Sequence, residues 1–155
     1  MNYWLLKTDP GSFSIDDLAR APGQTTAWDG VRNFQARNML RDAMRPGDLA
    51  FLYHSSCALP GIVGSVKVTR SGYLDVTAFN PRDHHFDPRS TPARPLWYCV
   101  DITLKQRFAQ PVTLAELRAQ RVLHDMLVLR RGNRLSVTPI TAKHWKHIIQ
   151  LTASR

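Results

Sequence analysis

The stretch from Trp28 to Asn38 carries the kinds of side chain that hold a nucleobase. It supplies one indole ring, two arginines (Arg32 and Arg37) and three side-chain amides. An aromatic ring stacks on a base, amides form in-plane hydrogen bonds with its edge, and arginines contact phosphates. These residue types predict a base-binding site. A tryptophan that fills the core beside solvated arginines is an equally good interpretation of this stretch taken alone.

A turn and a helix must position these groups. The pair Asp29-Gly30 favours a tight turn or left-handed backbone. Asn33 is a suitable N-cap, because its side chain can accept hydrogen bonds from the free amides of a first helical turn. Apolar residues then recur at helical spacing, so we expect a helix that runs to about Met44. An adjacent face of this helix would carry a basic stripe of Arg37, Arg41 and Arg45.

An excess of basic residues points to a polyanionic partner. The 155 residues carry a formal net charge of +9, and sixteen of the 21 basic residues are arginine. Arginine presents a planar fork that matches phosphates and base edges, so the charge favours nucleic acid. Arginine usage that merely reflects genome composition is the alternative. The length is typical of one domain, and we expect residues 1–155 to form a single unit.

Cysteine content and hydropathy bear on the cellular compartment. Cys57 and Cys99 do not make a disulfide framework, which indicates a reducing interior. The apolar run near Met1 is too short for a signal peptide, and no segment approaches the roughly 20 apolar residues of a membrane span. We therefore expect a cytoplasmic protein without a membrane partner. The sequence does not specify the oligomeric state, and we favour a monomer.

The apolar patterns predict an α+β domain. We expect strands at residues 3–7, 49–53, 61–68, 96–105 and 135–140, and further helices that begin near Ser14, Thr113 and Thr141. Residues 126–129 are a strand or a buried segment, and the proline-rich stretch 70–95 is expected to be a long loop. Because strands outnumber helices and do not alternate strictly with them, a curled sheet or small barrel is favoured. Gly61 and Gly64 would allow another backbone or a flat ligand to approach this sheet closely.

Histidines in the proline-rich stretch raise the question of a metal site. His84 and His85 follow Asp83 directly, and no cysteine is near. Adjacent side chains on an extended chain point in opposite directions, so the two histidines would not share an ion. We therefore expect no metal and no other cofactor.

Motifs for catalysis are absent from the sequence. It contains no Walker loop, dinucleotide-binding glycine pattern, nucleophile elbow or HExxH motif. Cys57 lies close to His54 along the chain, but sequence neighbours rarely form a nucleophile and base. These observations favour a binding module over an enzyme.

Five segments closely resemble the EVE domain family. They cover nearly the whole chain in family order: Tyr3–Pro10, Trp28–Asn38, Phe51–Ser55, Gly61–Gly64 and Arg134–Val137. The EVE family belongs to the PUA-like superfamily and is similar to the YTH domains, which recognise methylated adenine in RNA. The resemblance implies a mixed β-barrel of about five or six strands with flanking helices. It also implies a pocket for a modified base, chiefly modified cytosine in DNA or RNA, and no catalytic activity.

The resemblance further implies roles for individual residues. Lys7 matches a lysine that closes the first strand beside the pocket, Trp28 matches an aromatic wall, and Asn33 matches a base-contacting polar position of the YTH relatives. The residues at the end of the second strand match the pocket rim. The predicted ligand-binding set is Lys7, Trp28, Val31, Arg32, Asn33, Gln35, Tyr53, His54 and Ser55.

Contacts with the nucleic-acid backbone are predicted for a second, basic set. Its members come from the expected central helix and from a basic turn before the last strand: Arg37, Arg41, Arg130, Arg131 and Arg134. Two departures from the family pattern accompany these matches. Asp9 stands where the family often has Glu, and Gly72–Thr77 replaces a more usual Tyr-Pro-Asp.

Together these features predict a nucleic-acid-binding module that holds a flipped, modified base against Trp28. The alternative is an enzyme that acts on nucleic acid or a nucleotide. The related ASCH domains share the superfamily fold and some cut RNA, in which case Lys7, Tyr53 and His54 would take part in the chemistry. A third possibility is a scaffold protein whose basic face holds an acidic partner and whose own side chains fill the space beside Trp28.

Overall fold

One mixed sheet of six strands organises the chain in the computed structural model, which describes residues 1–155. The strands are β1 (Tyr3–Thr8), β2 (Thr25–Trp28), β3 (Leu49–His54), β4 (Gly61–Leu74), β5 (Tyr98–Thr113) and β6 (Val137–Ile140). They lie in the order β2-β5-β4-β3-β1-β6. β1 and β3 run parallel, and the other neighbouring pairs are antiparallel. The end strands β2 and β6 do not pair with each other, so the barrel is open.

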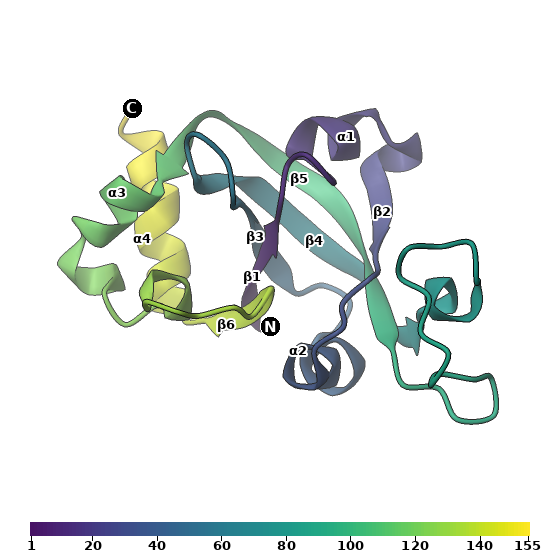
Figure 1. The fold of residues 1–155 in the computed structure, drawn as a ribbon. Coiled ribbons are helices and arrows are strands. Elements are labelled where there is room, and N and C mark those ends of the chain that lie inside the picture. Colours follow the sequence, from purple (N-terminus) through teal and green to yellow (C-terminus); the bar gives the residue numbers. More distant parts are fainter.

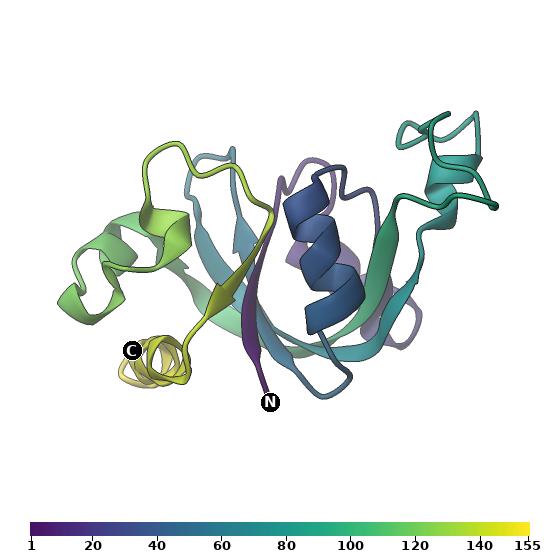
Figure 2. The ribbon, with the colours of Figure 1, turned by 90° about the horizontal axis from the view of Figure 1, so that it is seen from below.

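Four α-helices flank this sheet (Figure 1): α1 (Ile15–Arg20), α2 (Phe34–Asn38), α3 (Leu114–Arg118) and α4 (Ala142–Ala153). A π-helical turn, η2 (Met39–Ala43), continues α2, and 3₁₀ turns occupy η1 (Pro22–Gln24), η3 (Val76–Phe79), η4 (Arg121–Leu123) and η5 (Leu127–Leu129). Figure 2 shows the sheet bending around α2. In Figure 1, α3 and α4 lie at one end of the molecule and the segment after β4 lies at the other.

Side-chain caps fix the starts of the helices where the sequence predicts them. Ser14, Thr113 and Thr141 each accept a hydrogen bond from the amide three residues on, and the residue at that position reciprocates through its side chain. Asn33 accepts from the Ala36 amide and caps α2. Each cap satisfies amides that have no partner within the helix. The expected α+β class, with a sheet of about six strands and flanking helices, is confirmed.

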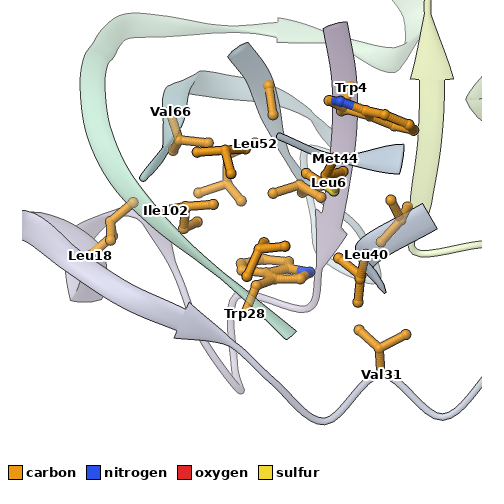
Figure 3. Close-up of a cluster of buried hydrophobic side chains, with 14 of the residues drawn as sticks. Trp4, Leu6, Leu18, Trp28, Val31, Leu40, Met44, Leu52, Val66 and Ile102 are labelled. Carbon is orange, nitrogen blue, oxygen red and sulfur yellow. The ribbon is translucent and has the colours of Figure 1, made fainter. Parts of the chain in front are cut away.

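Two apolar clusters lie on opposite faces of the sheet. Along β1, Trp4 and Leu6 belong to the first cluster, whereas Leu5 belongs to the second, because successive side chains of a strand point to opposite faces. The first cluster joins the sheet to α1 and α2 and includes Trp28 (Figure 3). The second joins the sheet to α3 and α4, where the rings of Phe51 and Trp145 stack with centroids 4.0 Å apart. The helices at the two ends therefore pack on different cores.

Four elements differ from their predicted form. β2 is a strand where an irregular segment was expected, and β4 and β5 extend to Leu74 and Thr113. Register shifts at four points between β4 and β5 break the alternation that would reveal such long strands. Residues 127–129 form a 3₁₀ turn rather than a strand.

Two glycines of β4 face the backbone of β5. A Cβ atom at Gly61 would lie 2.4 Å from the carbonyl oxygen of Val112, and one at Gly64 would lie 2.4 Å from that of Gln106. The close approach expected at these glycines is therefore made by another strand and not by a ligand.

Candidate nucleic-acid interface

A cavity of about 450 Å³ opens beside Trp28, between β1, the end of β2 and the segment after β4. Its volume lies within the roughly 300–1,000 Å³ typical of small-molecule sites. Its lining residues are Lys7, Thr8, Asp9, Ser12, Phe13, Thr26, Ala27, Trp28, Asp29, Gly30, Val31, Arg32, His84, His85 and Ser136. We call this cavity the Trp28 pocket. It has space for a flat heterocycle against an aromatic wall.

Trp28 serves both the pocket and the core. Trp28 is 8 % exposed and belongs to the first apolar cluster, as one interpretation of the sequence has it, and it also lines the pocket. Phe13 meets the indole edge to face, with ring centroids 6.4 Å apart and planes at 83°. The packing on one side holds the ring rigid, which prepares it for stacking because little side-chain freedom remains to be lost.

Four of the nine predicted ligand-binding residues line the pocket: Lys7, Trp28, Val31 and Arg32. Lys7 Nζ also donates to the Asn133 carbonyl oxygen at 3.4 Å, which ties the end of β1 to the basic turn 130–134. Ser136, which the sequence did not single out, lines the pocket just beyond that turn. The basic turn is thus a neighbour of the pocket.

The other five predicted ligand-binding residues lie outside the lining. The Asn33 side chain caps α2, and Gln35 is exposed on that helix. Tyr53 is buried in the second apolar cluster, on the far face of the sheet. Ser55 Oγ donates to the Thr8 carbonyl oxygen at 3.3 Å. All of these residues except the exposed Gln35 make other contacts within the protein, and a role in base binding stays a prediction for all five.

His54 also makes an internal contact. Its Nε2 atom accepts a hydrogen bond from the Ile15 amide at 3.1 Å. Burial lowers the pKa of His54, an effect that the charge of Asp16 opposes. The neutral ring fits this geometry, because Nε2 must be unprotonated to accept from an amide.

Arg32 holds the wall of the pocket together. Its guanidinium forms an ion pair of 2.9 Å with Asp75, whose side chain is fully buried, and donates to the His85 carbonyl oxygen at 2.7 and 3.1 Å. It also donates to Thr77 Oγ1 at 3.2 Å. Asp75 in turn accepts from the Gly30 amide at 2.8 Å. These contacts fasten the turn after Trp28 to the segment after β4.

A stack of four side chains continues from Arg32 across α2. The Arg32 guanidinium lies 5.3 Å from the ring centre of Trp97, Trp97 stacks on Phe34 at 4.8 Å, and the Arg37 guanidinium lies 4.9 Å from the ring of Phe34. Arg37 also donates to the Leu96 carbonyl oxygen at 2.8 Å. The two rings stack on each other, and each guanidinium group at the ends is attracted to the face of a ring through the ring quadrupole. We call Arg32, Trp97, Phe34 and Arg37 the cation–aromatic stack.

The predicted backbone-contacting arginines fall into two groups. Arg37 is engaged in the stack, and Arg41 pairs with Asp42 at 2.8 Å and lies over the Tyr98 ring. Within the basic stripe expected on the central helix, Arg37 is therefore held by the segment before β5, Arg41 lies against β5, and Arg45 is exposed. Arg130, Arg131 and Arg134 are exposed beside the pocket. These three arginines form no ion pair within the protein.

Desolvation at the pocket wall raises the pKa of Asp29, although more than a third of this residue remains open to solvent. The negative charge of Asp75 adds to this shift, and His85 opposes it. The pocket therefore carries both signs of charge, with Lys7 and Arg32 opposite Asp9 and Asp29.

Asp83, His84 and His85 are the residues here that could hold a metal ion. Their ligand atoms all lie within 4.8 Å of one another. The expectation that the two histidines point apart is wrong, because residues 83–85 lie in bends and turns instead of an extended strand. His84 and His85 both line the Trp28 pocket.

The curled mixed sheet, with an aromatic pocket beside its edge strand, defines a small α+β domain of the PUA-like kind. The EVE domain model matches residues 2–151, and the chain belongs to the EVE family. Thymocyte nuclear protein 1 of Homo sapiens is 39 % identical over 166 residues, which cover 97 % of this chain and 73 % of the relative.

Solved structures match over almost the full chain. The crystal structure of human THYN1 in complex with DNA that contains 5-methylcytosine has a TM-score of 0.92 at 38 % identity, covering 98 % of each chain. A crystal structure from Pseudomonas putida has a TM-score of 0.92 at 43 % identity, covering 97 % of this chain and 99 % of that one. An ASCH protein from Zymomonas mobilis shares only the fold, with 9 % identity and a TM-score of 0.55.

The names of the relatives correct the predicted location. The zebrafish, rat and human relatives are called thymocyte nuclear protein 1, which contradicts a cytoplasmic assignment. The features behind that assignment separate secreted proteins from others but do not separate nucleus from cytoplasm. No helix in the structure combines the length and apolar character needed to cross a membrane.

Proposed function

We propose that this protein binds nucleic acid and holds a modified cytosine, flipped out of its helix, in the Trp28 pocket. One observation carries the proposal. A base-sized cavity with an aromatic wall exists in a chain that matches, over nearly its whole length, a protein crystallised with 5-methylcytosine-containing DNA. An enzyme or reader that must reach a base in a duplex takes it out of the stack into such a pocket.

The pocket supplies the contacts that a flipped base needs. Trp28 and Phe13 offer aromatic and apolar surface for the ring and for a methyl group. Lys7 and backbone groups near Gly30 are at hand for the polar edge, whereas the N–H groups of Arg32 already donate within the protein. The exposed arginines of the turn 130–134 lie where the strand would continue beyond the pocket, since this turn joins Lys7 through Asn133 and the lining through Ser136.

We further infer that the protein acts by binding and not by catalysis. The three groups that an enzyme would use do not converge. Lys7 lines the pocket, His54 accepts from the Ile15 amide, and Tyr53 is buried on the far face of the sheet. General acid–base catalysis requires such groups within hydrogen-bond reach of one substrate. The positions support a binding module over a nuclease.

Fluorescence titration with matched oligonucleotides tests the base specificity. We expect duplex DNA with one central 5-methylcytosine to bind more tightly than the same duplex with cytosine. Burial of one methyl group is worth about 0.8 kcal/mol, which corresponds to roughly fourfold in affinity. RNA of the same sequence, with and without the modification, shows which nucleic acid is preferred. Equal affinity for all four would refute the proposed specificity.

The basic turn should govern the sequence-independent part of binding. Each lost phosphate contact lowers the slope of log affinity against log salt by about 0.9. The triple variant Arg130→Gln, Arg131→Gln and Arg134→Gln should therefore reduce this slope by up to about 3 and weaken modified and unmodified duplexes alike. A matched control removes three charges from residues that belong neither to the pocket lining nor to the turn: Arg118→Gln, Arg121→Gln and Lys146→Gln. If the control changes the slope as much, the turn has no special role.

A further inference from the structure

We propose that Asp83, His84 and His85 form a binding site for a divalent transition-metal ion, Zn²⁺ being the best match, at the rim of the Trp28 pocket. No part of the base-binding function requires this site. The inference starts from the turn at residues 83–85, which brings two imidazole rings together with centroids 3.8 Å apart and planes at 42°. Both rings approach the same carboxylate.

The ligand atoms have nearly the separation that a tetrahedral ion requires. Asp83 Oδ1 lies 3.3 Å from His85 Nδ1 and 3.8 Å from His84 Nδ1. Around Zn²⁺, with bonds of about 2.0–2.1 Å, tetrahedral geometry places ligand atoms roughly 3.3–3.4 Å apart. The first distance fits as it stands. The 3.8 Å distance, and the separation of the two imidazole ligand atoms, which is at most 4.8 Å, require His84 to move inward. Its side chain is 85 % exposed and therefore unhindered.

Two of the three ligands are already held in place. The Asp83 carboxylate accepts a hydrogen bond of 2.8 Å from the His85 amide. The carbonyl group of His85 is fixed by Arg32, and its ring lies directly over Gly30, where a Cβ atom would come within 2.4 Å of Nε2. Outer contacts that orient metal ligands are a regular feature of metal sites, because they lower the cost of ordering the ligands. Only His84 remains to be ordered by the ion.

The chemistry of the donors selects the class of metal. Two imidazoles and one carboxylate suit Zn²⁺ and its transition-metal neighbours, whereas Mg²⁺ and Ca²⁺ prefer oxygen ligands throughout. Three protein ligands leave a fourth position open. Because both histidines line the pocket, that position is accessible to water or to an oxygen or nitrogen atom of a molecule bound there. The nearby carboxylate of Asp29 favours a cation, and the Arg32 guanidinium opposes it.

Calorimetric titration of the metal-free, untagged protein with Zn²⁺ tests the site without any nucleic acid. We expect binding of one ion per chain, and visible d–d bands of tetrahedral Co²⁺ when cobalt replaces zinc. His84→Ala should weaken binding at least tenfold, and the double variant His84→Asn, His85→Asn should abolish it. Since His84 is exposed, its replacement leaves the fold intact, which circular dichroism verifies.

Control variants distinguish this site from the other histidines. His147 lies in α4 and His124 directly follows η4, and Figure 1 shows α4 at the opposite end of the molecule from the segment after β4. His124→Asn with His147→Asn should therefore leave the affinity unchanged. Absence of binding heat and of the cobalt spectrum would overturn the proposal. Binding that survives the loss of His84 and His85 but not that of His124 and His147 would overturn it equally. Neither result affects base recognition, which the oligonucleotide titrations measure separately.

Discussion

Arg32→Leu is expected to lower the free energy of unfolding by about 3 kcal/mol. The substitution leaves the Asp75 carboxylate, which has no exposed surface, without its charged partner. Loss of one member of a buried pair typically costs about 3–5 kcal/mol. The lower end applies here, because Asp75 keeps hydrogen bonds from the Gly30 amide and from the amide and hydroxyl of Thr77. Urea denaturation followed by tryptophan fluorescence measures the change.

An exposed pair of the same type provides the control. Arg20 and Asp17 also lie 2.9 Å apart, but their side chains are 72 % and 41 % exposed. Arg20→Leu should leave the free energy of unfolding nearly unchanged, because water screens such pairs. If the two variants were equally stable, Arg32 would not anchor the pocket wall.

The same carboxylate predicts how stability depends on pH. Desolvation acts to raise the pKa of Asp75, but hydrogen bonds from Thr77, Arg32 and the Gly30 amide together lower it. A carboxyl group whose pKa is lower in the folded state binds protons more readily when unfolded. Its contribution is therefore complete above its unfolded pKa of about 3.9 and is lost as the pH falls through the lower folded value. The stability difference between wild type and Arg32→Leu should accordingly shrink below about pH 4.

Trp28→Leu is expected to remove the preference for a modified base. Stacking on an aromatic side chain is worth about 1–3 kcal/mol per base, so without it the flipped state is no longer favoured, and affinity for the 5-methylcytosine duplex should fall roughly fourfold, to that of the unmodified duplex. Affinity for unmodified DNA should change little, because phosphate contacts dominate that binding. Fluorescence titrations at a temperature where the variant is fully folded measure both.

A second tryptophan separates loss of stacking from loss of core packing. Trp4 belongs to the same apolar cluster as Trp28 but does not line the pocket. Trp4→Leu should destabilise the protein as well, since it opens the core and removes a hydrogen bond of 3.0 Å to Asp48, yet it should keep the base preference. Unaltered discrimination in Trp28→Leu would show that the indole does not contact the base.

Local patterns in the sequence predicted those features that depend on a few neighbouring residues. Capping boxes located the starts of α1 and α3, and apolar runs located most strands, because caps and strand faces depend on short-range geometry. The resemblance to EVE domains predicts that Trp28 and Lys7 belong to one site, and both residues line the Trp28 pocket. The sequence does not predict β2, because a strand of four residues that pairs with only one neighbour is too short to show an alternating apolar pattern.

The other residues whose positions differ from the prediction are placed by tertiary packing. Tyr53 shares a strand face with Phe51, and nothing local shows that this face is opposite the pocket. Arg37 is predicted to contact phosphates, but its guanidinium donates to the carbonyl oxygen of Leu96, in the segment before β5. An extended chain would point the side chains of His84 and His85 in opposite directions, but a turn brings their rings together. Each case depends on a long-range or loop conformation that periodicity does not encode.

The cation–aromatic stack has a consequence for how this surface can evolve. Arg32, Trp97, Phe34 and Arg37 each touch the next, so the effect of replacing one depends on whether its neighbour is present. Double-mutant cycles along the stack should therefore be non-additive. Natural variants of the fold should exchange these four side chains as a set, while isolated substitutions would be selected against.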